Sequence, residues 1–190
     1  MQIQAQTSDT TNAVIYTTPD GTSIIFPKEY DKTHQTMTPE KAIELYGKVP
    51  VQLRKLGQRK IVFHDMYNPY DNYWRSVYKN FTNSYATGGD VIDFWRYDFP
   101  HNDYYVVRTY CHEIAHKIDI DRGITVPGGA WEQAIQSDML FSRKKSVTDY
   151  GENSPIEDFA ESVAEYVNDV NAFKKLFPER AKILKSILEY

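Results

Sequence analysis

The longest regular pattern of apolar and polar residues lies between Asp103 and Gly123. When successive residues are placed about 100° apart, as in an α-helix, the apolar ones fall on one side. They are Val106, Val107, Tyr110, Cys111, Ile114, Ala115 and Ile118. Asp103 can cap the start of such a helix, and Gly123 can end it. The pattern therefore predicts one amphipathic helix that packs its apolar side on the core.

Shorter patterns predict strands and helices on both sides of this segment. In chain order they are a hairpin of residues 13–17 and 22–26 around T-P-D-G, a helix that begins at Thr38-Pro39, a second helix or its continuation over 49–57, a strand over 60–64, a helix over 71–78, a strand over 90–97, and helices around 131–140, after Ser154 and over 178–188. Helices dominate the second half of the chain, whereas the first half mixes both kinds of element. This distribution predicts an α+β fold.

The chain of 190 residues has the length of one domain, and it contains no internal repeat and no Gly/Ser/Pro-rich linker. We therefore expect residues 1–190 to form a single monomeric domain, with residues 1–12 as a flexible N-terminal tail. The formal net charge is −4 and there is no long Lys/Arg cluster, which excludes an electrostatic surface for nucleic acid or an anionic membrane.

In the printed residues we expect neither a membrane-spanning segment nor a signal peptide. There is no apolar run of 18 residues, so we expect no membrane insertion. The first nine residues, M-Q-I-Q-A-Q-T-S-D, are too polar for a signal peptide. Either the protein is cytoplasmic or a leader has been removed. Cys111 is the single cysteine, and its place on the apolar side of the helix predicts a buried structural thiol, with a catalytic thiol as the alternative.

The predicted helix contains the motif H-E-x-x-H, as His112-Glu113-Ile114-Ala115-His116. Residues four apart are neighbours on one face, so both imidazoles can reach one metal ion. Glu113 lies about 100° round from His112, where it can face a metal-bound water more easily than the ion itself. Because the motif is short, two solvated surface histidines remain an alternative.

A third metal ligand has to come from elsewhere in the chain. The three-histidine pattern H-E-x-x-H-x-x-G-x-x-H is excluded, because positions 119 and 122 are Asp and Arg. The later acidic residues are Glu152, Glu157, Asp158, Glu161 and Glu165. In the helix after Ser154, only Glu157 and Glu161 lie close enough to the apolar side to reach a shared cleft. S-P-I-E is also a capping box, so the spacing leaves Glu157 open as a ligand or as a cap.

Two motifs in register resemble a known family. H-E-I-A-H-K-I-D, followed by Tyr150 and by Glu157 seven residues later within E-D-F-A-E, looks like the anthrax lethal factor-like zinc peptidases, which include the secreted Pro-Pro endopeptidases. The resemblance implies a zincin-like fold with a small mixed sheet and a helical C-terminal half. It also implies a zinc-dependent endopeptidase that is secreted.

Residue roles follow from the same resemblance. It implies that His112, His116 and Glu157 bind zinc, that Glu113 is the general base, and that Tyr150 donates a hydrogen bond to the developing oxyanion. Asp119 and Glu161 look like partners that orient the ligand imidazoles. Without the family, Asp119 and Glu161 could be solvated carboxylates and Tyr150 a packing residue.

The substrate is predicted from the strand over 90–97, which directly precedes the helix. We expect an extended protein or peptide substrate to bind along it as an added strand, near Asp93, Phe94 and Trp95. Two features differ from the Pro-Pro endopeptidases: Ile156 stands where they have an acidic residue, and residues 73–88 lack their Lys-Gly-Trp-type stretch. These differences bear on the preference for cleavage next to proline and not on the zinc chemistry. The alternative function is a catalytically inactive zincin-like binding domain or toxin-accessory domain.

Overall fold

The computed structural model of the protein describes residues 5–30, 37–78, 86–96 and 102–188. Its central element is α5, Asp103–Arg122, which carries the H-E-x-x-H motif. Gly123 ends this helix in the left-handed conformation (φ 61°), as predicted, because glycine adopts that conformation without steric cost. The predicted cap was one residue off. The side chain of Asn102 accepts the hydrogen bond from the Tyr104 amide, and Asp103 lies in the first turn.

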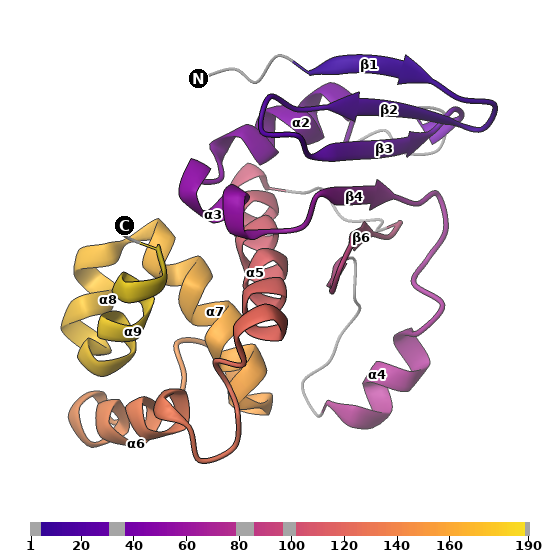
Figure 1. Ribbon diagram of the computed structural model, residues 1–190. Helices are drawn as coiled ribbons and strands as arrows, with labels where there is room; N and C mark the ends of the chain where they lie inside the picture. The colour runs from indigo at the N-terminus through magenta and orange to yellow at the C-terminus, as the bar shows by residue number, and fades with distance from the viewer. Residues whose placement is uncertain (1–4, 31–36, 79–85, 97–101, 189–190) are drawn as a thin grey trace.

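One face of α5 packs on a six-stranded mixed sheet (Figure 1). The strands are β1 Gln6–Asp9, β2 Ala13–Thr17, β3 Ser23–Pro27, β4 Lys60–Phe63, β5 Ala86–Gly88 and β6 Ile92–Phe94. Their order across the sheet is β1-β2-β3-β4-β6-β5, with parallel pairing of β3 with β4 and of β4 with β6. Ile92 and Phe94 point into the core, where Phe94 contacts Tyr110 of α5. The strand predicted over 90–97 is thus confirmed for Ile92–Phe94 only, and residue 97 lies outside the described residues.

Residues 1–4 of the predicted flexible tail lie outside the described residues, and part of the remainder differs from that prediction. Gln6–Asp9 pair antiparallel with β2 as the first strand of the sheet, although their side chains are exposed. The pattern could not show this, because the strand is held by backbone hydrogen bonds and not by an apolar face.

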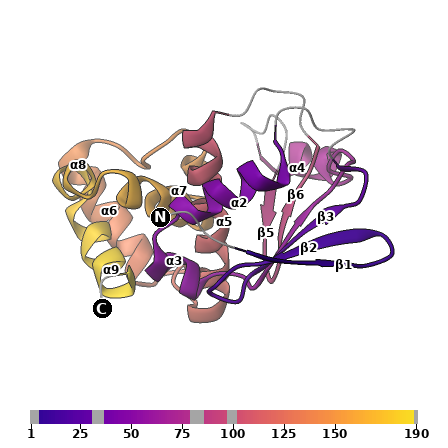
Figure 2. The same ribbon diagram turned by 90° about the horizontal axis from the view of Figure 1, so that it is seen from above.

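The helices form the rest of the structure. They are α2 Pro39–Lys48, α3 Val51–Leu56, α4 Asp71–Val77, α6 Ala130–Ser142, the 3₁₀ turn η1 Gly151–Asn153, α7 Pro155–Asn168, α8 Val170–Leu176 and α9 Pro178–Leu188. Viewed from above, α5 lies between the sheet and the group formed by α6, α7, α8 and α9 (Figure 2). The described residues therefore make a single compact α+β unit with a helical C-terminal half. None of their helices is long and apolar enough to cross a bilayer.

A buried polar network fixes α7 against its neighbours. Arg180 of α9, fully buried, donates from Nη1 to Asp158 of α7 (2.6 Å) and from Nε to Asp138 of α6 (3.1 Å). Trp131 Nε1 donates to the other oxygen of Asp158 (3.0 Å). Breaking one partner of such a buried ion pair is costly, so this network holds the helix that carries Glu157 in one position.

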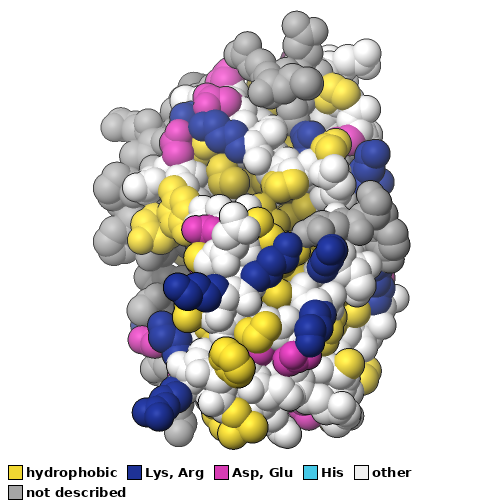
Figure 3. Space-filling model, turned by 90° about the vertical axis from the view of Figure 1, so that its left-hand side faces the viewer, with side chains coloured by type: hydrophobic (Ala, Val, Ile, Leu, Met, Phe, Trp, Pro, Cys, Tyr) yellow, Lys and Arg dark blue, Asp and Glu magenta, His cyan; other side chains and the backbone are white. Residues whose placement is uncertain are grey.

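The outer side of the C-terminal helices is shown in Figure 3. Its described Lys and Arg side chains are dispersed among apolar and uncharged ones and do not form one continuous basic surface.

Candidate metal centre and catalytic cleft

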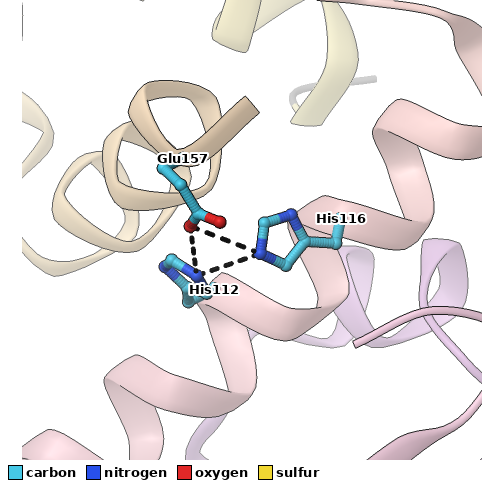
Figure 4. Close-up of side chains that lie close together, drawn as sticks. All are labelled: His112, His116 and Glu157. Carbon is cyan, nitrogen blue, oxygen red and sulfur yellow. Dashed lines mark hydrogen bonds and ion pairs between the residues drawn. The ribbon is translucent and has the colours of Figure 1, made fainter. Parts of the chain in front are cut away.

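The structure brings the three predicted metal ligands together (Figure 4). Nε2 of His112 lies 3.1 Å from Nε2 of His116. Oε2 of Glu157 lies 3.2 Å from the first of these nitrogens and 3.6 Å from the second. The carboxylate of Glu157 points from α7 toward both imidazoles of α5. Among the described residues, these three make the one His/Cys/Asp/Glu group of this kind.

The spacing of these atoms fits a tetrahedral metal ion. Ligand atoms bound at about 2.0–2.1 Å in a tetrahedral zinc site lie about 3.3–3.4 Å from one another, which is the centre of the observed range. Oε2 of Glu157 is also buried without a hydrogen-bond partner, a costly state for a carboxylate oxygen. Two nitrogens and one oxygen are a donor set that Zn²⁺ accepts. The residues present therefore fit a zinc ion.

Electrostatics also favours a cation at this point. Burial alone would lower the pKa of His112, but the carboxylates of Glu157 and Glu161 raise it to about 10. Burial and the neighbouring His112 lower the pKa of His116 to about 4, so this imidazole is neutral and its lone pair is available at ordinary pH. Two buried carboxylates thus attract positive charge to the place where the two Nε2 atoms meet.

The side chain of Glu157 has the orientation of a candidate metal ligand and not that of a cap. Ser154 caps α7 by accepting a hydrogen bond from the Glu157 amide (3.2 Å). The Glu157 carboxylate faces the histidines instead of turning back to the helix start. The remaining candidates on α7 have other partners, since Asp158 binds Arg180 and Glu165 accepts a hydrogen bond from Arg108.

Glu161 has the contact predicted for it. Its Oε1 lies 2.8 Å from Nδ1 of His112, which leaves Nε2 of that ring facing the centre. Arg108 donates to both oxygens of Glu161, at 3.0 and 2.5 Å, and Thr148 donates to Oε2 at 2.6 Å. Burial would raise the pKa of Glu161, but His112 and Arg108 lower it below the ordinary range, so the carboxylate stays ionised.

Asp119 has a different role from the predicted one. Its oxygens accept hydrogen bonds from the amide (2.8 Å) and the hydroxyl (2.6 Å) of Thr125, in the turn after α5. The carboxylate lines the cleft near His116 but is engaged in closing this turn. Spacing along the helix could not show it, because Thr125 lies beyond the helix end.

Glu113 lies in the cleft beside the three candidate metal ligands. Its buried side chain lines the same cleft as the three candidate ligands, and burial raises its pKa to about 7. The edge strand β5 packs directly on it, since a Cβ atom added at Gly88 would lie 2.6 Å from Oε2 of Glu113. Gln58 strengthens this contact, because its Nε2 donates to the carbonyl oxygens of Glu113 and Gly89, both at 2.9 Å.

Tyr150 lies beside the metal centre. Its ring centroid is 6.0 Å from that of His112, and the residue lines the cleft. Burial and the nearby Glu157 raise the pKa of Tyr150 above its ordinary value, so the phenol stays protonated and can donate a hydrogen bond. Tyr78 lies edge-on to it, with ring centroids 6.2 Å apart, and also lines the cleft.

The cleft has a volume of about 330 Å³. Besides the residues already named, apolar groups on its walls are contributed by α4, α5 and α7: Trp74, Ile120 and Ile156. Four further neighbours of the centre were not predicted from the sequence: Tyr78, Gln58, Arg108 and Thr148. Only Arg108 carried a signal, since it lies one helical turn before His112.

The predicted substrate strand is wrong in its location. β6 is paired on both sides, with β4 and with β5, so its backbone groups cannot accept another strand. Phe94 is buried in the core. Asp93 lies 2.7 Å from Nε2 of His64, and Trp95 stacks on His64 and donates to Thr87. The sheet ends instead at β5, which has no second neighbour among the described strands.

Cys111 is buried as predicted. Burial raises the pKa of its thiol to about 12, which disfavours the thiolate that nucleophilic catalysis requires. The structural role therefore stands.

Comparisons of the chain with protein-family models, with curated proteins and with solved structures found no match.

Proposed function

We propose that this protein is a zinc-dependent endopeptidase. The observation that carries the proposal is the group of His112, His116 and Glu157. Its three facing atoms lie at the spacing of ligands in a tetrahedral metal site, and one of them is a buried carboxylate oxygen without a hydrogen-bond partner. A metal-binding protein without catalytic function would need only these three. The proposal adds Glu113 and Tyr150, because both line the cleft beside the centre.

The residues divide the chemistry between them. A zinc ion at the centre supplies a Lewis acid that polarises a carbonyl group and makes water acidic enough to lose a proton near neutral pH. The Glu113 carboxylate accepts a proton from the attacking water and delivers it to the amide nitrogen that leaves. The Tyr150 hydroxyl donates a hydrogen bond to the carbonyl oxygen as negative charge develops on it.

The substrate is proposed to be an extended peptide that lies in the cleft beside Thr87 and Gly88 of β5. Both residues line the cleft, so a chain that lies along them passes close to Glu113. Ile120, Ile156 and Trp74 make the nearby walls apolar. This favours apolar or proline residues next to the scissile bond.

The test is cleavage-site profiling on a diverse peptide library with the zinc-loaded protein. Glu113→Gln, which keeps the side-chain volume but cannot accept the proton, is the blank. Cleavage that requires both zinc and Glu113 supports the proposal. One bound zinc per chain without any cleavage would reject the peptidase and leave the alternative of an inactive zincin-like binding domain. A profile without enrichment of proline would reject the Pro-Pro preference alone.

A further inference from the structure

Thr148 occupies an unusual place in the segment that leads from α6 to η1. Its hydroxyl donates to Oε2 of Glu161 (2.6 Å) and accepts a hydrogen bond from the amide of Gly151 (3.1 Å). Thr148 and Gly151 lie on either side of Tyr150 in the chain, so the second of these hydrogen bonds spans the Tyr150 turn. A carboxylate can only accept, so the hydroxyl proton is committed to Glu161 and its lone pair is free for the amide.

The other partner of this hydroxyl is a rigid anchor. Glu161 is buried in α7 and is held by Arg108 through both oxygens, while it also contacts Nδ1 of His112. A hydrogen bond to an ionised partner is among the stronger ones in proteins. Thr148 therefore ties the Tyr150 turn to the same carboxylate that orients a candidate metal ligand.

A second contact, independent of Thr148, seats the turn on α7. A Cβ atom added at Gly151 would lie 3.3 Å from the Cα of Asp158 and would overlap Oγ of Ser146. The backbone after Tyr150 is thus packed directly on the helix that carries Glu157. Two contacts therefore hold the Tyr150 turn: the close packing of Gly151 on α7, and the hydrogen bond between the Gly151 amide and the Thr148 hydroxyl.

We infer that Thr148 is a positioning residue, whose hydroxyl holds the Tyr150 phenol beside the metal centre. The inference rests on the proposed peptidase function for its kinetic consequence, but the position of Tyr150 can be measured without any turnover. Removing the hydroxyl leaves the Gly151 amide without its partner and frees the turn from Glu161. A shift of the phenol of order 1 Å weakens a contact made in the transition state.

The kinetic experiment compares Thr148→Val, which replaces the hydroxyl by a methyl group of similar size, with Thr148→Ser, which keeps it. With a peptide selected from the library, Thr148→Val lowers kcat about tenfold with KM within about twofold, and Thr148→Ser restores most of the loss. The same substitution is then made in a Tyr150→Phe background. There it has no further effect, because the group that it positions is already absent.

The structural experiment places 3-fluorotyrosine at position 150 and records its ¹⁹F resonance. Thr148→Val shifts or broadens the resonance, whereas Thr148→Ser leaves it as in the parent protein. Melting temperatures of both variants establish that they are folded, and zinc release to a chelator shows whether the metal ligands are affected.

Two results would overturn the inference. One is an unchanged ¹⁹F resonance in folded Thr148→Val. The other is a tenfold loss that persists in the Tyr150→Phe background together with faster zinc release, which would mean that Thr148 acts through Glu161 and His112. If no peptide is cleaved at all, the proposed function fails, while the ¹⁹F comparison still decides the role of Thr148.

Discussion

Replacing Gly88 by alanine separates the edge strand from the general base. The added methyl group would lie 2.6 Å from Oε2 of Glu113 and 2.8 Å from its carbonyl oxygen. The side chain can turn aside, but the carbonyl belongs to the backbone of α5 and cannot. Restoring ordinary contact with this carbonyl at 3.4 Å requires β5 and α5 to move apart by about 0.6 Å.

The magnitude follows from that displacement. Overpacking of this kind costs about 1–3 kcal/mol, which a typical domain tolerates without unfolding. It lowers the melting temperature by about 2–12 °C in a chain of this size. A misplacement of about 1 Å costs up to about 100-fold in rate, so this smaller displacement lowers kcat/KM by about 10–20-fold.

Gly89→Ala is the matched control. Its added Cβ atom meets nothing within 4 Å. Like Gly88→Ala, it lowers the conformational entropy of the unfolded chain, so this effect is the same in both variants. Steady-state kinetics with one library-derived peptide, melting temperature and zinc content are measured for both variants. Gly88→Ala with the melting temperature and the kcat/KM of Gly89→Ala would refute the close packing of β5 on Glu113.

The remaining predictions concern the centre itself. His116→Ala abolishes stoichiometric zinc in elemental analysis, and a variant that keeps one zinc per chain would remove His116 from the ligand set. Glu113→Gln keeps zinc and fold but loses nearly all turnover; loss of the metal would make Glu113 a ligand instead. Tyr150→Phe lowers kcat about 100-fold with little change in KM, and an unaltered kcat would leave Tyr150 a packing residue. In the metal-free protein, burial raises the pKa of Glu113 from 4.5 to about 7. The neutral carboxyl group is therefore compatible with folding below about pH 4.5, whereas the free energy of unfolding decreases as the pH rises to about 7 and the buried group ionises. Glu113→Gln is therefore more stable than the parent at pH 8, by about 3 kcal/mol, and similar to it at pH 4.5; denaturant unfolding at both pH values checks this, and equal differences at both would contradict it.

The sequence by itself determined the helices around the site. The apolar period and the glycine after it define α5, because helical periodicity and capping depend on residues only a few positions apart. The same local rules place His112 and His116 on neighbouring turns. Ser154 and Pro155 likewise mark the start of α7.

The tertiary structure alone decided which groups meet. S-P-I-E fits a cap as well as a ligand, and only the packing of α7 on α5 turns the Glu157 carboxylate toward the histidines. Asp119 has the spacing of a partner for His116, yet the turn beyond the helix engages it through Thr125. Side-chain direction at such points depends on neighbours that sequence spacing does not contain.

The order of the strands in the sheet could not be predicted from the sequence for a related reason. β6 has the alternation of a strand with one buried face, but alternation does not say whether its backbone edges are free. The two edges of β6 pair with β4 and with β5. β5 has only three residues, too few for a pattern that predicts a strand. Backbone pairing between distant segments depends little on side-chain identity, and so the edge beside Glu113 became visible only in the folded chain.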